Sequence, residues 1–181
     1  MQATCCRSPQ SGISLVQALI TLALVAVMCA AGLSSFKDAL DWRRLEGHSH
    51  ELLHTLHWGR SLSVSAHNDI RLSVQQTSAG SCYVVYTGSM GSCACDASGA
   101  SVCSAGATAH KTALISSSDR IQLSSNVNAL MWEPQQGRAT PAGSLTLTHA
   151  NGNSIKLVVN MLGRVRACVP AGASNRGYPV C

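Results

Sequence analysis

The chain has 181 residues, 46% of them hydrophobic and 12% charged, and its formal net charge is +5. This length suits one domain with a real hydrophobic core, and so small a charge excludes a tight, dedicated nucleic-acid-binding protein. Only one Phe is present, so Leu, Val and Ile must supply most of the core. The sequence contains no internal repeat and no sign of a second domain.

The N-terminus joins a short basic, polar leader, residues 1–12, to an apolar stretch without formal charge from residue 13 to residue 33. A helix of that length covers roughly 32 Å, enough for the hydrocarbon core of a bilayer. A secretory signal peptide has a shorter apolar core with a cleavage site after it. Here Gly12 precedes the apolar stretch, so a cut after Gly12 removes the leader and keeps the helix. We therefore predict a transmembrane helix over residues 13–34.

This helix is expected to continue beyond the membrane to about residue 59. Apolar side chains recur there at roughly helical spacing, and charged side chains occupy the positions between them. Gly59 is the expected helix end. The apolar positions are Leu40, Trp42, Leu45, Leu52, Leu53 and Leu56.

From residue 70 onward the pattern changes to short β-type runs separated by Gly, Ser and Asn. Asn151-Gly152 lies between two such runs and predicts a hairpin turn. Residues 88–109 read as a loop of small residues held by cysteines. Together these features predict an α+β fold, with a long N-terminal helix packed on a β-rich globular head (residues 35–181). Strands are expected at 70–74, 82–86, 113–115, 121–123, 129–132, 144–149 and 154–160.

Nine cysteines are present, and three of them, Cys5, Cys6 and Cys29, lie in the leader or in the apolar helix. The remaining six are an even number, which favours disulfides in an oxidising periplasm over a zinc site. Six cysteines permit fifteen connectivities, which the sequence does not decide between; the favoured pair is Cys168 with Cys181, which would close the C-terminal tail into a small loop. The other four are expected to bridge among themselves, and they are Cys82, Cys93, Cys95 and Cys103.

The N-terminal junction resembles the prepilin signature. Residues 12–19 read Gly-Ile-Ser-Leu-Val-Gln-Ala-Leu, where the signature has Gly, a hydrophobic residue, Ser or Thr, Leu, a hydrophobic residue and Glu. The resemblance implies cleavage after Gly12 by a prepilin peptidase and N-methylation of Ile13. Gln17 replaces the usual Glu and cannot form the charge-assisted pair with a neighbouring subunit's amine during filament assembly. A minor or terminal subunit therefore fits better than a major pilin, and the alternative is an ordinary single-pass anchor.

Two later segments resemble the FimT/GspH group of minor pilins and pseudopilins. One is the helix segment Leu52-Leu53-x-x-Leu56-x-x-Gly59-Arg60-Ser61, where members often read "LARSEA". The other is the C-terminal run Asn160-Met161-Leu162-Gly163-Arg164-Val165-Arg166. The resemblance implies a pilin-like fold. A Gly-Arg-x-Arg motif near the C-terminus is associated with the DNA-binding members, and residues 163–166 match it.

Charge supports DNA contact independently of this resemblance. Between residues 82 and 181 the sequence has seven basic residues and three acidic ones. In an extended segment Arg164 and Arg166 point to the same side and Val165 turns inward, so that both guanidiniums reach phosphates while Gly163 lets the backbone approach. Arg176 is a candidate third contact. Such contacts carry no base specificity. The alternative is that these arginines form a solvated surface or pair with acidic groups of neighbouring subunits.

Other chemistry is not supported by the sequence. His50, His54 and His57 share one helix face, but no fixed acidic or cysteine ligand accompanies them, so a solvated face is expected instead of a metal site. No Gly-x-Ser-x-Gly elbow is present and no Ser, His and acid arrangement suggests a nucleophile. We expect no enzyme, no cofactor and no catalytic residue.

The function expected is that of a minor, FimT-like type IV pilin that binds DNA non-specifically for uptake and natural transformation. Its partners are other pilins or pseudopilins, a prepilin peptidase, and the inner membrane before assembly, with the head in the periplasm and later at the cell surface. The first alternative is a GspH-like subunit that primes pilus or type II secretion assembly without binding DNA. The second is a surface protein or adhesin that forms no filament.

Overall fold

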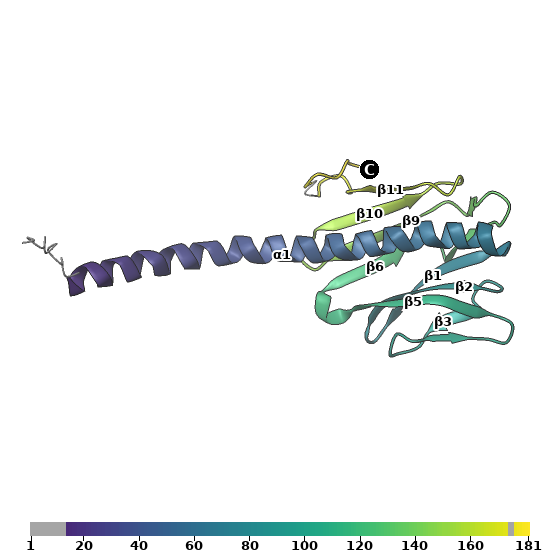
Figure 1. Ribbon diagram of the computed structural model, residues 1–181, viewed down its shortest axis with the longest axis horizontal. Coiled ribbons are helices and arrows are strands. Elements are labelled where there is room, and N and C mark those ends of the chain that lie inside the picture. Colours follow the sequence, from purple (N-terminus) through teal and green to yellow (C-terminus); the bar gives the residue numbers. More distant parts are fainter. Residues whose placement is uncertain (1–13, 174–175) are drawn as a thin grey trace, which may run out of the picture. The chain divides into compact units, whose positions relative to one another are not determined.

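The computed structural model describes residues 14–173 and 176–181, which belong to two compact units, Met1–Leu40 and Asp41–Cys181. The expected leader, with Gly12 and Ile13 at its cleavage site, lies outside the described residues. One long helix, α1 (Leu15–Ala66), contributes residues to both units (Figure 1).

In the first unit, α1 exposes apolar side chains over several turns. Leu15, Leu22 and Met28 are 76%, 67% and 74% exposed. Gln17 lies near the start of the helix and is exposed as well. Over the residues that the structure describes, no helix is long and apolar enough to cross a membrane.

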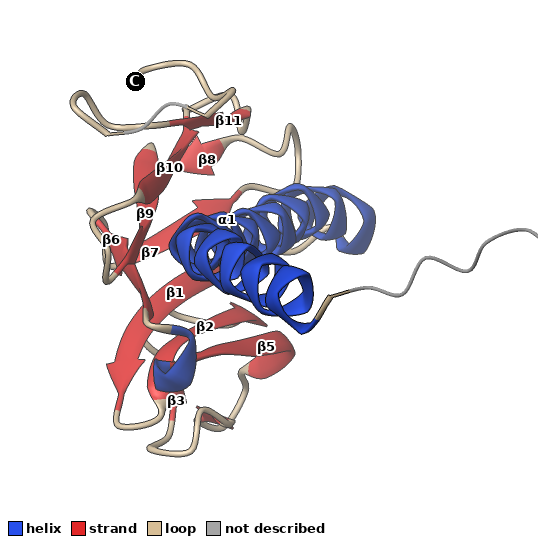
Figure 2. Ribbon diagram, turned by 90° about the vertical axis from the view of Figure 1, so that its left-hand side faces the viewer, coloured by secondary structure: helices blue, strands red, loops and turns tan. Residues whose placement is uncertain are grey.

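In the second unit, which we call the head, α1 lies along the strands and buries one face against them (Figure 2). Leu45, Leu52 and Leu56 on this face are fully buried because their spacing returns them to one side of the helix. Strand side chains such as Leu72, Leu130 and Leu147 complete the same core. The α+β fold expected from the sequence is confirmed.

The helix ends at Ala66, so the predicted end near Gly59 is wrong. Gly59 lies inside the helix. Because it has no side chain, the Trp132 ring packs directly against the helix there, and an added Cβ atom would lie 3.0 Å from that ring. One turn later, the buried Ser63 donates a hydrogen bond from its hydroxyl to the Trp132 carbonyl (2.8 Å). The helix stops where His67 adopts a left-handed backbone conformation, with φ at 52°.

Two antiparallel sheets make up most of the head. The first has the order β5-β2-β1-β7-β8 and the second the order β11-β10-β9-β6, so that β11 is an edge strand. A hydrogen-bonded bridge links the sheets, because Ser81 and Gln76 of the first sheet bond to each other and to the backbone of Leu123 in the second. The strands are β1 Ile70–Thr77, β2 Gly80–Thr87, β3 Cys93–Cys95, β4 Ser101–Cys103, β5 Thr108–Ser116, β6 Ile121–Ser125, β7 Ala129–Trp132, β8 Ala139–Thr140, β9 Gly143–His149, β10 Ser154–Val159 and β11 Val165–Cys168.

The segment predicted as a loop between residues 88 and 109 is more ordered than expected. It contains the β3–β4 hairpin, and β5 begins at its end. Disulfides hold this hairpin, because Cys93 pairs with Cys103 across it and Cys95 ties it to Cys82 of β2. The third disulfide joins Cys168 to Cys181, the pairing that the sequence predicted. The small side chains gave no strand signal, and the crosslinks supply the order instead.

Candidate nucleic-acid interface

The Gly-Arg-x-Arg motif begins in a tight turn between β10 and β11. The Asn160 side-chain oxygen accepts hydrogen bonds from the backbone N–H groups of Leu162 (3.1 Å) and Arg164 (2.9 Å). The Asn160 carbonyl accepts another from the N–H of Gly163 (2.9 Å). Asn is suited to this position because its short side chain can mimic a backbone turn. The turn therefore has a defined conformation that fixes where β11 begins.

The arginines of the motif alternate with apolar residues along the start of β11. Arg164 and Arg166 are exposed, while Val165 is half-buried and packs against the core. Val165 lies opposite Val159 of β10 in the ladder, and Arg166 lies opposite Val158. This is the alternation that the sequence predicted for an extended segment. Two guanidinium groups therefore reach solvent from an edge strand.

A third arginine, from α1, lies beside them. Arg60 and His57 line a surface hollow of about 430 Å³ together with Asn160 and the two motif arginines. The Arg60 Nε atom donates a hydrogen bond to the Gly137 carbonyl (3.1 Å), which orients the guanidinium. We call Arg60, Arg164 and Arg166 the arginine cluster. Within the described ranges, none of these three arginines has a carboxylate within ion-pair distance.

Sequence reasoning did not assign Arg60 to this site. Its neighbours along the chain indicated only a helix, and Arg164 is about a hundred residues away, so no spacing rule could join them. Helical periodicity places Arg60 and His57 one turn apart on the same face, and this was the only indication in the sequence that the two side chains are neighbours.

Gly163 has a structural role that differs from the expected one. Its φ is +73°, and an added Cβ atom would lie 2.3 Å from the Gly137 carbonyl oxygen and 2.9 Å from Arg60 Nε. The residue is also buried. Glycine is therefore required here by packing inside the head, and close approach of a ligand to the backbone is not needed to explain it.

Arg176, the expected third contact, lies elsewhere. Its guanidinium carbon is 5.2 Å from the centre of the Trp42 ring, and Trp42 also packs edge-to-face on Tyr178 with ring centres 6.1 Å apart. Trp42 and Arg60 are separated by roughly 27 Å along α1 at the usual helical rise. Arg176 therefore belongs to the opposite end of the head, and its placement in one site with Arg164 and Arg166 is wrong.

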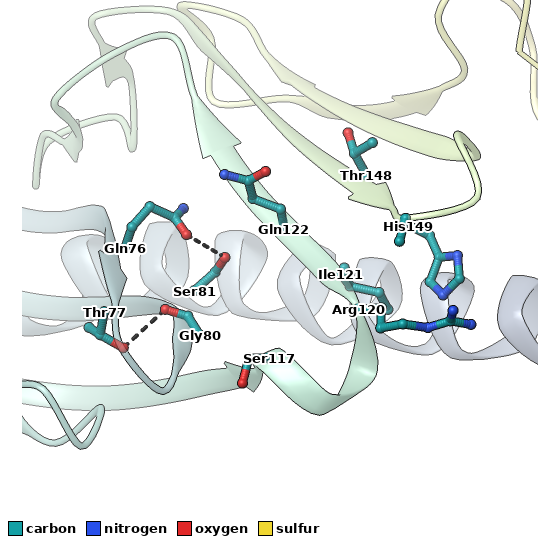
Figure 3. A pocket seen from close by; sticks show the side chains of 11 residues that line it. Gln76, Thr77, Gly80, Ser81, Ser117, Arg120, Ile121, Gln122, Thr148 and His149 are labelled. Atoms are coloured by element: carbon teal, nitrogen blue, oxygen red, sulfur yellow. Dashed lines mark hydrogen bonds between the residues drawn. The ribbon is translucent and has the colours of Figure 1, made fainter.

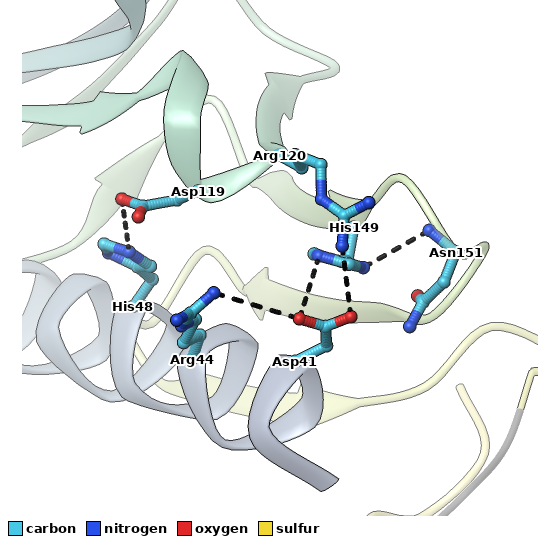
Figure 4. Close-up of polar contacts among 7 residues, drawn as sticks. All are labelled: Asp41, Arg44, His48, Asp119, Arg120, His149 and Asn151. Atoms are coloured by element: carbon cyan, nitrogen blue, oxygen red, sulfur yellow. Dashed lines mark hydrogen bonds and ion pairs between the residues drawn. The ribbon is translucent and has the colours of Figure 1, made fainter. Parts of the chain in front are cut away.

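At that opposite end, charges are paired, as Figure 4 shows. One carboxylate oxygen of Asp41 lies 3.3 Å from the Arg120 guanidinium. The other lies 3.8 Å from Nε2 of the buried His149 ring. The other nitrogen of His149, Nδ1, accepts a hydrogen bond from the N–H of Asn151 (3.2 Å). His48 lies 3.4 Å from Asp119. We call Asp41, His149 and Arg120 the Asp41 network.

Three histidines of α1 have different neighbours. His48 faces Asp119, His50 lies 3.4 Å from the Tyr178 hydroxyl, and His57 lines the hollow beside the arginine cluster. No group of three or more His, Cys, Asp or Glu side chains within residues 14–173 and 176–181 could hold a metal ion.

A second hollow, of about 330 Å³, lies where β1 and β2 separate from β6 and β9 (Figure 3). Its polar lining includes Gln76 and Ser81, which bond to each other (2.9 Å). The Ser81 hydroxyl also accepts the N–H of Leu123 (3.0 Å). These groups are occupied in joining the two sheets, so the hollow offers them to no ligand.

Comparison with known proteins identifies a family. The sequence model of a family described as type II transport protein GspH matches residues 48–163, more than half of the chain. The matched segment ends at Gly163, so Arg164 and Arg166 lie just beyond it. No curated protein and no solved structure matches the chain.

Proposed function

The chain belongs to the type II transport protein GspH family, and on that premise we propose that this minor pilin or pseudopilin binds DNA without sequence preference. The contacts would be made by the arginine cluster, with Arg164 and Arg166 on phosphates and Arg60 beside them. The observation that carries the proposal is three neighbouring arginines without a carboxylate partner in the described part of the chain.

The geometry suits a phosphate backbone. Arg164 directly precedes β11 and Arg166 lies within it, and an extended backbone separates the Cα atoms of two such residues by about 6.6 Å. Guanidinium groups bind phosphate oxygens bidentately, and such contacts are independent of base sequence. With only three cations, one head binds weakly, and several subunits or neighbouring pilins would supply the avidity.

A structural role in assembly is the second candidate, and the exposed apolar surface of α1 favours it. Helices with this surface need a partner, which the core of a filament or a bilayer provides. We propose that the helix inserts in the inner membrane before assembly, with the head in the periplasm. Cleavage after Gly12 by a prepilin peptidase and methylation of Ile13 belong to the same proposal. Pilus and type II secretion systems both fit it.

The DNA proposal is tested with the full chain purified in detergent. Fluorescence anisotropy would measure binding to a random-sequence duplex across a salt series. We expect Arg164→Ala/Arg166→Ala to reduce affinity at low salt at least tenfold. The slope of log affinity against log salt should also become shallower, by about 0.9 for each phosphate that the variant no longer neutralises.

The matched control is Arg43→Ala/Arg44→Ala, which removes the same charge from two exposed arginines (79% and 59% side-chain exposure) paired with Glu46 and Asp41. Equal reductions in both variants would indicate general attraction to a cationic protein and would contradict an assigned site. No binding by the wild type at low salt would leave the assembly role as the function.

Assembly is tested separately in cells. Mass spectrometry of the mature N-terminus should detect a methylated Ile13, and an uncut leader would contradict the prepilin proposal. Gln17→Glu restores the carboxylate that the prepilin signature carries, and we expect it to raise the amount of this subunit recovered in filaments.

A further inference from the structure

Two consecutive apolar side chains lie at the tip of the β10–β11 turn. Met161 and Leu162 are 61% and 58% exposed. Among the described residues of the head, they form the only adjacent pair of strongly exposed large hydrophobic side chains. Single exposed apolar residues are normal on a protein surface, but a neighbouring pair in a turn is a candidate contact.

The turn holds both residues in this exposed position. The N–H of Leu162 donates to the Asn160 side chain, and the Met161 carbonyl accepts the N–H of Ala139 in β8 of the first sheet (3.1 Å). Gly163 packs so closely on the Gly137 carbonyl and the Arg60 side chain that no room is left for a Cβ atom. The backbone on both sides is therefore held in place, and its conformation directs both side chains away from the core.

The same turn borders the arginine cluster. Asn160 lines the hollow with Arg60, Arg164 and Arg166, and Leu162 precedes Arg164 by two residues. An apolar tip beside cations without carboxylate partners matches a ligand with negative charge along one side and apolar surface along the other. A nucleic acid has both, because phosphates and base faces lie within a few ångströms of each other.

We propose that Met161 and Leu162 pack against unstacked bases, so that the arginine cluster prefers single-stranded DNA to intact duplex. This inference rests on the proposed function and adds the form of DNA that the site takes. In a duplex the base faces are covered by stacking, and the apolar tip gains nothing unless a base step opens. In a single strand the faces are free, and both side chains bury exposed apolar surface on binding.

The test compares three ligands of the same length, about 20 nucleotides per strand, on the full chain in detergent; the two single-stranded ligands have equal phosphate numbers. They are a mixed-sequence single strand, the corresponding duplex, and an abasic strand that keeps the backbone but lacks bases. We expect the wild type to bind the single strand about five- to tenfold more tightly than the abasic strand, and more tightly than the duplex. Met161→Ser/Leu162→Ser should remove this difference and leave the abasic affinity unchanged.

Met90→Ser/Val102→Ser is the matched control, because Met90 and Val102 are 62% and 59% exposed but lie at the β3–β4 side of the head. It should retain the wild-type preference. A preference that survives in Met161→Ser/Leu162→Ser overturns the inference, and so does equal binding of the single strand and the abasic strand by the wild type. Failure of the proposed function differs in its result, because Arg164→Ala/Arg166→Ala would then leave binding of all three ligands unchanged.

Discussion

The two ends of the head both carry arginines, but their surroundings differ. In the Asp41 network, Arg120 meets a carboxylate that is itself largely buried and that also faces His149. In the arginine cluster, Arg164 and Arg166 extend from an edge strand, and within the described chain only the Gly137 carbonyl holds one of the three guanidiniums.

This difference separates two uses of positive charge. A cation beside a buried carboxylate offsets the cost of that carboxylate's reduced hydration, so it belongs to the stability of the fold. A cation in solvent without a partner contributes little to stability and remains available to an anionic ligand. Substitutions at the two ends should therefore affect different measurements.

The largest effect on stability is expected at Gly163, the buried glycine beside the arginine cluster, because the backbone packs closely there. Gly163→Ala forces a side chain into a position with φ of +73° and into the Gly137 carbonyl. We expect the free energy of unfolding in urea to fall by about 3 kcal/mol. Gly152→Ala is the control, since its φ is +90° but its space is open, and it should cost about 1 kcal/mol. Equal costs would show that the close approach to Gly137 is unimportant.

The next effect is expected at the paired end. Asp41→Asn removes the charge that faces His149 and Arg120 while keeping the side-chain shape. We expect a decrease of about 2 kcal/mol in the free energy of unfolding, because a buried ring nitrogen is deprived of its anionic neighbour. Asp69→Asn, whose side chain is 48% exposed beside Arg71, should change stability by less than about 0.5 kcal/mol. A similar small change at Asp41 would contradict the structural role of the network.

A buried tyrosine of β2, Tyr83, whose hydroxyl donates a hydrogen bond to Glu51 of α1, tests pairing through pH. Burial, opposed by a hydrogen bond with Thr55 and reinforced by the Glu51 charge, raises the pKa of Tyr83 from 10.0 to about 12. Between these two values the unfolded chain releases this proton first, so stability is complete below pH 10 and falls as the pH rises toward 12. The fall should be on the order of 2 kcal/mol, measured by urea unfolding at successive pH values. Tyr83→Phe should flatten the decline, and an unchanged slope would assign it to other groups.

The smallest effect on stability is expected for the arginine cluster. Arg164→Ala/Arg166→Ala should change the free energy of unfolding by less than about 0.5 kcal/mol, even though the same variant is expected to bind DNA more weakly. Thermal and urea unfolding of the full chain would measure it. A decrease above about 1 kcal/mol would mean that these arginines serve the fold, and the contrast between the two ends would no longer hold.

Local features of the fold were predictable from the sequence. The Asn151-Gly152 signal predicted the hairpin between β9 and β10, and the structure has it, with Gly152 at φ of +90°. The alternation around Val165 predicted which side chains of β11 face solvent. The spacing of Leu45, Leu52 and Leu56 predicted the buried face of α1. Each of these depends on neighbours within a few residues, where backbone periodicity decides direction.

The candidate site was predictable only in part. The motif indicated Arg164 and Arg166, but the same charge argument added Arg176, which packs on Trp42 at the other end of the head. Net charge and residue type carry no information on distance in space, and a tail closed by a disulfide can return to either end of a sheet.

The sequence by itself indicated the long helix, most of the strands and the solvent side of β11, and the pairing it favoured, Cys168 with Cys181, is present. Only the tertiary structure decided that α1 continues past Gly59, because the residue that packs against this glycine, Trp132, is more than seventy residues away in the sequence. It also decided that Arg60 joins Arg164 and Arg166. Long-range packing brings such residues together, and the energy of that packing outweighs the local preference of any single glycine or arginine.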